Sequence, residues 1–323
     1  MAFDQGLPAR VELHRVFRSG VKTYLRRVFS AMKVVRSHEI DTVLLSGKFS
    51  LWTGLLLKVG GVRSPMVAIL HGYEIKPKNR VARWFTRMAI ELADQLIPVS
   101  AFTESLLPSK IRQQGKTTII PNGIMVNEFP ANVEKLTKLA GSPVLLTVGN
   151  VTLRKGQHRV IRAMPAILKT FPDACYHMVG LPTLRMEFEG LADDLGVQEH
   201  VVFHGHLPSR EELFEAYRSA DVFCILSENQ PNGDVEGFGI VVLEANMLGL
   251  PAIGAKGCGI SDAIKDGING YLVDGDSPED VADALSDLLK QRKEMAVTSR
   301  KWAEDHDWDQ LVERFLKVIE QVG

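Results

Sequence analysis

The chain has 323 residues, of which 45% are hydrophobic and 24% charged, and its formal net charge is −1. This composition is typical of a soluble globular protein, and the length suits about two domains. No apolar run is long enough to span a bilayer, and the N-terminal segment lacks the apolar core of a signal peptide.

The near-zero net charge hides an asymmetry between the two halves of the chain. Residues 1–130 hold 19 Lys+Arg and 9 Asp+Glu, whereas residues 131–323 hold 19 and 30. The densest basic stretch runs from Arg10 to Arg36, and its apolar residues recur at helical spacing: Leu25, Val28, Phe29, Met32 and Val35. Such a helix either lies on an anionic membrane surface or packs its apolar stripe on the protein core. Periodicity alone favours packing on the core.

Short apolar runs alternate with helical patterns along the chain. In the first half, strands are predicted at residues 42–45, 66–70, 95–99 and 118–120, with a helix at 81–93. In the second half, strands are predicted at 144–148, 175–179, 201–203, 222–226, 251–254 and 270–273, with helices at 156–169, 184–195, 210–219, 240–248 and 307–322. This alternation predicts parallel sheets covered by helices on both faces.

Two such series predict an α/β protein with two doubly wound, Rossmann-like domains. We place the first domain at residues 1–128 and the second at 129–305, with a C-terminal helix at 306–323 that crosses back to the first domain. The joint is expected near Pro121–Ser142, where Pro, Asn and Gly cluster. The three cysteines Cys175, Cys224 and Cys258 show no CxxC spacing, which predicts reduced thiols in a cytoplasmic protein rather than metal ligands or disulfides.

Ligands bind such sheets at the carboxyl ends of the strands. Arg154 and Lys155 follow the strand at 144–148 and suit a diphosphate through charge-assisted hydrogen bonds, although an isolated basic turn is more often solvated. His71 follows the strand at 66–70 and is either a hydrogen-bond partner of a sugar hydroxyl or a structural residue. Gly180 follows the strand at 175–179 and would let a base or ribose pass close to the backbone.

The most informative stretch is Glu236 to Glu244, in which two carboxylates flank a Gly237-Phe238-Gly239 turn and the start of a helix. Glycine allows the backbone to approach a ligand closely, and a helix N-terminus attracts anions. The two carboxylates would accept hydrogen bonds from hydroxyl groups. The pattern therefore suits a phosphorylated sugar, whereas the simpler alternative is a common turn followed by a solvated glutamate.

Together these segments resemble the retaining glycosyltransferases of family GT4, which have the GT-B fold with two Rossmann-like domains facing a cleft. The matching pieces are His71-Gly72, Pro121-Asn122-Gly123-Ile124, Val148-Gly149, Arg154-Lys155-Gly156, Glu236-Gly237-Phe238-Gly239, Glu244-Ala245 and residues 266–273. The hexapeptide from Asp234 to Gly239 is most similar to bacterial mannosyltransferases of lipid and polysaccharide pathways.

The resemblance implies roles for individual residues. His71 would approach the transferred sugar, Glu236 would contact its hydroxyls, and Arg154 and Lys155 would stabilise the departing diphosphate; these four form the implied catalytic set. The implied donor-binding set is Gly149, Gly180, Leu207, Phe238, Gly239, Ile240 and Glu244. No metal and no cofactor is expected, because the two cations and the helix end already neutralise the leaving group.

The implied reaction moves a hexose from a nucleotide-diphosphate sugar to a glycan, a lipid-linked acceptor or a small polyol. GDP-mannose is the favoured donor and a UDP-hexose the next. We expect a cytoplasmic protein without a nucleic-acid partner. If the Arg10–Arg36 segment lies on a membrane rather than on the core, that surface is the inner face of an anionic membrane.

Two departures from the family pattern stand out. Nothing in residues 1–20 fits the family's first strand and its glycine-rich loop, so we expect a shortened first domain, either in a fragment or in an unusually short enzyme. The alternative function is that of a non-catalytic paralogue that binds nucleotide or partner proteins. The sequence Cys258-Gly259-Ile260-Ser261-Asp262 stands where Gly-Gly-Ile-Pro-Glu is usual.

Overall fold

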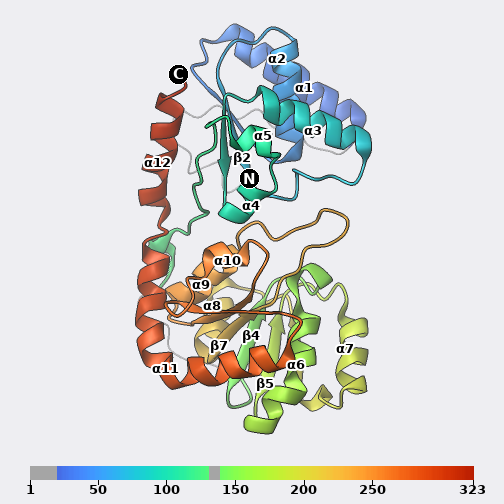
Figure 1. Ribbon diagram of the computed structural model, residues 1–323, viewed down its shortest axis with the longest axis vertical. Coiled ribbons are helices and arrows are strands. Elements are labelled where there is room, and N and C mark those ends of the chain that lie inside the picture. The colour runs from blue at the N-terminus through green and yellow to red at the C-terminus, as the bar shows by residue number, and fades with distance from the viewer. Residues whose placement is uncertain (1–19, 131–138) are drawn as a thin grey trace.

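The computed structural model describes residues 20–130 and 139–323, and these fold into two parallel α/β units joined by a helical connection (Figure 1). Residues 10–19 of the basic Arg10–Arg36 segment and residues 131–138 of the predicted joint lie outside the described residues. We use "first domain" for the part before residue 129 and "second domain" for residues 139–305.

The first domain contains a parallel sheet in the order β1-β2-β3. Its strands are β1 (Val43–Ser46), β2 (Met66–Leu70) and β3 (Gln95–Pro98), and its helices are α1 (Val21–Ser37), α2 (Lys48–Val59), α3 (Arg80–Leu92), α4 (Ala101–Ser105) and α5 (Ser109–Arg112), with a 3₁₀ turn at Val126–Glu128. The strand β2 is central and almost fully buried, as its apolar sequence predicts. Asn79 caps α3 by accepting hydrogen bonds from two backbone N–H groups of the first turn.

The prediction of a strand at residues 118–120 is wrong. This segment runs beside β3, but the isolated bridge to β3 joins Leu96 to Thr117, just before the segment. The amide of Thr118 donates to the carbonyl of Leu96 and the amide of Ile120 donates to that of Pro98. Because Pro98 has no N–H group, β3 cannot return the intervening ladder bond, and the pairing stops short of a strand.

The second domain contains a six-stranded parallel sheet in the order β6-β5-β4-β7-β8-β9. Its strands are β4 (Val144–Val148), β5 (Cys175–Val179), β6 (Val201–Gly205), β7 (Val222–Ile225), β8 (Ala252–Ala255) and β9 (Gly270–Val273). Its helices are α6 (Gln157–Thr170), α7 (Arg185–Asp194), α8 (Arg210–Ser219), α9 (Ile240–Met247), α10 (Ile260–Ala263) and α11 (Pro278–Glu304), with 3₁₀ turns at Leu153–Lys155 and Gln198–His200. Separate apolar clusters cover the two faces of the sheet, which is the layering that the sequence predicts for this unit.

The 27-residue helix α11 was not anticipated from the sequence. It packs against α6 and α9 of the second domain. The final helix, α12 (Trp308–Glu320), then runs alongside the first domain (Figure 1). There Leu311, Phe315 and Val318 join a cluster with Val67 and Ile97 of the first sheet. Helix α12, which follows the second domain in the chain, thus packs on the first sheet.

The basic helix α1 packs only part of its apolar stripe on the core. Met32 and Val35 contact the core of the first domain, whereas Leu25 is 47% and Phe29 72% exposed. Helix α1 therefore differs from an ordinary surface helix, which would bury its whole apolar stripe on the core. Within the described residues, no helix has both the length and the apolar character needed to cross a membrane.

Candidate active site

The loop between β4 and α6 carries the two predicted cations in a 3₁₀ turn, Leu153–Lys155. Gly156 ends this turn with a φ of 75°, and a Cβ added there would lie 1.9 Å from the carbonyl oxygen of Leu226. Only glycine meets both conditions, since other residues avoid this backbone region. The side chain of Gln157 accepts a hydrogen bond from the amide of Thr152 (3.3 Å) and donates one to the carbonyl of Asn150 (3.0 Å). The side chain of Gln157 thus links the two ends of this loop through its backbone.

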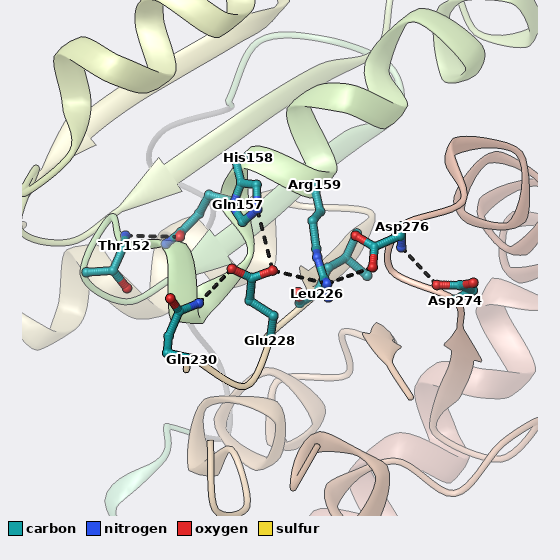
Figure 2. Close-up of polar contacts among 9 residues, drawn as sticks. All are labelled: Thr152, Gln157, His158, Arg159, Leu226, Glu228, Gln230, Asp274 and Asp276. Carbon is teal, nitrogen blue, oxygen red and sulfur yellow. Dashed lines mark hydrogen bonds and ion pairs between the residues drawn. The ribbon is translucent and has the colours of Figure 1, made fainter. Parts of the chain in front are cut away.

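A polar network anchors this loop to the ends of two other strands (Figure 2). Arg159 of α6 lies 3.1 Å from the carboxylate of Glu228 and 2.9 Å from that of Asp276. Gln230 donates to Glu228 at 2.6 Å, and the amide of Glu228 donates to the carbonyl of Arg154 at 2.9 Å. The segments after β7 and β9 are thus tied to the backbone that carries the cations.

Glu236 brings the two cations together. Its carboxylate lies 2.7 Å from Nζ of Lys155 and also accepts a hydrogen bond from the guanidinium of Arg154, whose Nε lies 3.3 Å from Asp234. The Lys155 and Glu236 side chains are 13% and 12% exposed, so a solvated basic turn is not what the structure contains. Burial alone would raise the pKa of Glu236, but the charges and hydrogen bonds of Lys155 and Arg154 outweigh it and lower that pKa.

The helix α9 begins shortly after Glu236 in the chain, and its N-terminus has no side-chain cap. Gly239 takes the N-cap position with a φ of 97°, and Ile240 begins the helix and is 41% exposed. The side chain of Phe238 is 2% exposed and belongs to the core, so only its backbone is available to a ligand. An uncapped N-terminus leaves N–H donors and a positive dipole end, which suit a phosphate.

Glu244 lies one turn further along α9 and accepts a hydrogen bond from the hydroxyl of the buried Tyr217 at 3.0 Å. Burial raises the pKa of Glu244, and the Tyr217 hydrogen bond and the nearby charges of Arg210 and Lys155 oppose this shift. Tyr217 was missed in the sequence analysis because a helical tyrosine carries no signal of its partner.

The first domain contributes His71 at the carboxyl end of β2. Its Nε2 lies 2.9 Å from Oγ of Ser46, at the end of β1, and its backbone amide donates to the fully buried Glu74 at 2.6 Å. Burial lowers the pKa of His71. A Cβ added to Gly237 would lie 1.9 Å from the carbonyl oxygen of His71, so the two domains meet at this point. The structure therefore brings His71 beside the turn that carries Glu236.

The other predicted donor-binding residues lie at neighbouring strand ends. Gly149 follows β4 with a φ of 146° and Gly180 follows β5 with a φ of 145°. A Cβ on Gly180 would lie 2.2 Å from the carbonyl oxygen of Gly149, so the contact of these two strand ends itself requires glycine. Leu207 follows β6 and is partly buried against the core. No group of three or more His, Cys, Asp or Glu side chains suited to a metal ion occurs in the part of the chain that the structure describes.

Comparisons with known proteins bear on what this site does. The family described as "Glycosyl transferases group 1" matches residues 128–305, and "Glycosyltransferase Family 4" matches residues 3–128. A "GDP-mannose-dependent alpha-(1-6)-phosphatidylinositol monomannoside mannosyltransferase" from Mycolicibacterium smegmatis is 33% identical over 292 residues, which cover 86% of this chain and 76% of the relative. A "D-inositol 3-phosphate glycosyltransferase" from Xylanimonas cellulosilytica is 31% identical over 222 residues, which cover 63% of this chain and 51% of the relative.

Solved structures agree on the fold. Sucrose-phosphate synthase from Thermosynechococcus elongatus superimposes with a TM-score of 0.76 at 20% identity, covering 93% of this chain and 78% of that one. The Anabaena protein Alr3699/HepE, solved in complex with UDP-glucose, superimposes with a TM-score of 0.72 at 19% identity, covering 93% of this chain and 82% of that one. These likenesses, with the two parallel sheets, establish the GT-B architecture.

Proposed function

This chain belongs to glycosyltransferase family 4, and we propose that it transfers mannose from GDP-mannose, with retention of configuration, to a phosphate-bearing glycolipid or polyol. Membership of the family supports a transferase rather than the non-catalytic nucleotide-binding paralogue. The observation that carries the proposal is the partly buried cluster of Lys155, Arg154 and Glu236, which shortly precedes the uncapped N-terminus of α9 in the chain.

The proposed division of labour follows from charge and position. Arg154, Lys155 and the N-terminus of α9 stabilise the negative charge that grows on the diphosphate as the bond to the sugar breaks. Glu236 stays ionised, because its pKa is lowered, and accepts hydrogen bonds from the sugar hydroxyls. Glu244, braced by Tyr217, accepts hydrogen bonds from the ribose. His71, whose pKa is lowered, approaches the sugar as a neutral ring from the first domain.

We also propose that transfer needs no divalent metal, because two partly buried cations and a helix N-terminus can neutralise the diphosphate. Activity after treatment with EDTA and gel filtration is then expected to equal that of the untreated protein. A loss that Mg²⁺ or Mn²⁺ restores would overturn this part of the proposal.

We assign the acceptor head group to a cavity of about 500 Å³ between the domains. Lys76 and Arg83 line it from the first domain, together with Gly72, the neighbour of His71, and residues of the 229–235 segment line it from the second. Two exposed cations next to the sugar site suit a phosphate. The names of the relatives from Mycolicibacterium smegmatis and Xylanimonas cellulosilytica mention phosphatidylinositol monomannoside and inositol 3-phosphate.

The test measures sugar transfer from GDP-mannose and from UDP-glucose to phosphatidylinositol monomannoside and to inositol 3-phosphate. We expect turnover with GDP-mannose and its loss in Glu236→Ala. Turnover with UDP-glucose alone would replace GDP-mannose as the proposed donor, and the proposed site residues would stay the same. Calorimetric binding of GDP without transfer to any acceptor would favour the non-catalytic paralogue.

A membrane surface is a further proposed partner. The exposed apolar residues Leu25 and Phe29 of α1 lie among the exposed cations Lys22, Arg26 and Lys33, which suits an anionic leaflet. Sedimentation with phosphatidylglycerol vesicles at low salt is expected for the wild type and weakened in Phe29→Ser. Equal sedimentation with neutral phosphatidylcholine vesicles, or none at all, would refute it.

A further inference from the structure

The short helix α4 of the first domain lies against α10 of the second domain (Figure 1). We propose that Asp262 of α10, together with Ser100 and Thr103 of the first domain, forms an interdomain latch that holds the domains closed and positions Glu236. The role of Glu236 in this inference rests on the proposed function. The latch itself rests on the hydrogen bonds between the two domains.

Asp262 supplies one half of the latch. Its Oδ1 accepts a hydrogen bond from the amide of Ala101 at 2.8 Å and its Oδ2 accepts one from the amide of Phe102 at 3.2 Å. These amides belong to the first turn of α4, whose N–H groups have no partner within the helix. A carboxylate at a helix N-terminus is also favoured by the helix dipole. The second domain thus completes the cap of a helix in the first domain.

Ser100 and Thr103 supply the other half. Both hydroxyls donate to the carbonyl oxygen of Gly237, at 2.6 and 3.3 Å, and both side chains are at most 1% exposed. Ser100 Oγ also accepts a hydrogen bond from the amide of Thr103, which fixes its position at the start of α4. The first domain therefore binds the carbonyl group of Gly237, the residue that directly follows Glu236.

The same turn is held from the side of α10. The amide of Gly259 donates to the carbonyl of Glu236 at 2.9 Å, and a Cβ added to Gly259 would lie 2.2 Å from the carbonyl carbon of Gly237. Asp262 lies three residues further along, and its own amide donates to the carbonyl of Gly259. Glu236, Gly237 and α10 therefore form one backbone unit that the first domain contacts at two places.

Separation of the domains would break both contacts together. The hydroxyls of Ser100 and Thr103 would lose the Gly237 carbonyl, and the turn carrying Glu236 would lose its support from the first domain. The cations and the α9 N-terminus, in contrast, belong to the second domain alone. The latch is therefore expected to govern the sugar-transfer step, and the nucleotide to bind without it.

The test compares Asp262→Ala and Ser100→Ala with wild type. For Asp262→Ala we expect kcat to fall about tenfold to a hundredfold, because a charged acceptor of hydrogen bonds is lost. For Ser100→Ala we expect a fall of about twofold to tenfold, because its hydroxyl donates to an uncharged carbonyl. The Kd for GDP should change less than about twofold in both variants. Small-angle scattering with GDP should give a larger radius of gyration for Asp262→Ala. Asp262→Asn keeps one acceptor oxygen and should lie between Asp262→Ala and wild type.

Ser105→Ala is the matched control, because the Ser105 hydroxyl donates only within its own helix, to the carbonyl of Phe102 at 2.7 Å. Wild-type kcat and scattering in a folded Asp262→Ala would overturn the latch, as would a parallel rise in the Kd for GDP. If the wild type transfers no sugar, the proposed function fails, and the scattering comparison still decides whether the latch exists.

Discussion

Replacing Lys155 with alanine perturbs the proposed donor site at its most buried cation. Lys155 Nζ lies 2.7 Å from Glu236, and the two side chains are 13% and 12% exposed. Breaking a buried ion pair costs about 3–5 kcal/mol when the remaining charge has no partner. Here Arg154 stays bound to the same carboxylate. We therefore expect the free energy of unfolding to fall by only about 1.5–3 kcal/mol, the value of one hydrogen bond to a charged group.

The effect on catalysis is expected to be larger than the effect on stability. Removal of one preorganised donor to a developing negative charge lowers kcat by about 10²–10³. Initial rates of mannose transfer and urea unfolding measure the two effects separately. Lys169→Ala, an exposed lysine at the end of α6, is the control and should leave both unchanged. A folded Lys155→Ala enzyme with wild-type kcat would refute the assignment of Lys155 to the leaving diphosphate.

Three further predictions follow from contacts in the second domain and from burial of histidines. Glu244→Gln should weaken GDP binding about tenfold, measured by calorimetry, whereas an unchanged Kd would remove Glu244 from the ribose site. Gly156→Ala should lower the free energy of unfolding by more than about 1 kcal/mol, because its φ is 75° and its Cβ would meet the carbonyl of Leu226; urea unfolding like that of wild type would contradict this. Stability should fall as the pH drops below about 6.5, the ordinary histidine value, because the unfolded chain then binds more protons than the folded one. Thermal unfolding between pH 7 and pH 5 tests this, and a constant midpoint would refute it. The histidines concerned have pKa values lowered by burial: His71, His158, His177, His204 and His306.

The sequence was sufficient to predict most strands of both sheets, because the interior of a parallel sheet requires continuous apolar runs. The strand Val144–Val148, for example, is buried at every position. The prediction failed at residues 118–120, where apolar character was present but Pro98 removed a donor from the neighbouring strand. The helix α11 was missed although its start carries clear signals: Ser277 caps it and Pro278 opens it.

The residues of the candidate site were easier to predict than their contacts. The sequence indicates Arg154 and Lys155 by their position after a strand and Glu236 by its place before a Gly-Phe-Gly turn and a helix, and the structure brings the three together. Their ion pairs join residues about 80 positions apart, and no local pattern specifies such a contact. Periodicity likewise located α1, yet how much of its apolar stripe is covered depends on the neighbouring α2 and β1.

The electrostatics of the cluster limit what Glu236 can do. A carboxylate whose pKa is lowered by two cations remains ionised at neutral pH. Glu236 therefore has no proton to donate as a general acid, and its lowered pKa makes it a weak general base. Its charge also neutralises part of the positive charge of Arg154 and Lys155 while no donor is bound. A diphosphate would compete for both cations and leave the carboxylate oxygens free to accept hydrogen bonds from sugar hydroxyls. In the proposed function, Glu236 therefore holds the cations in place before the donor binds and orients the sugar afterwards.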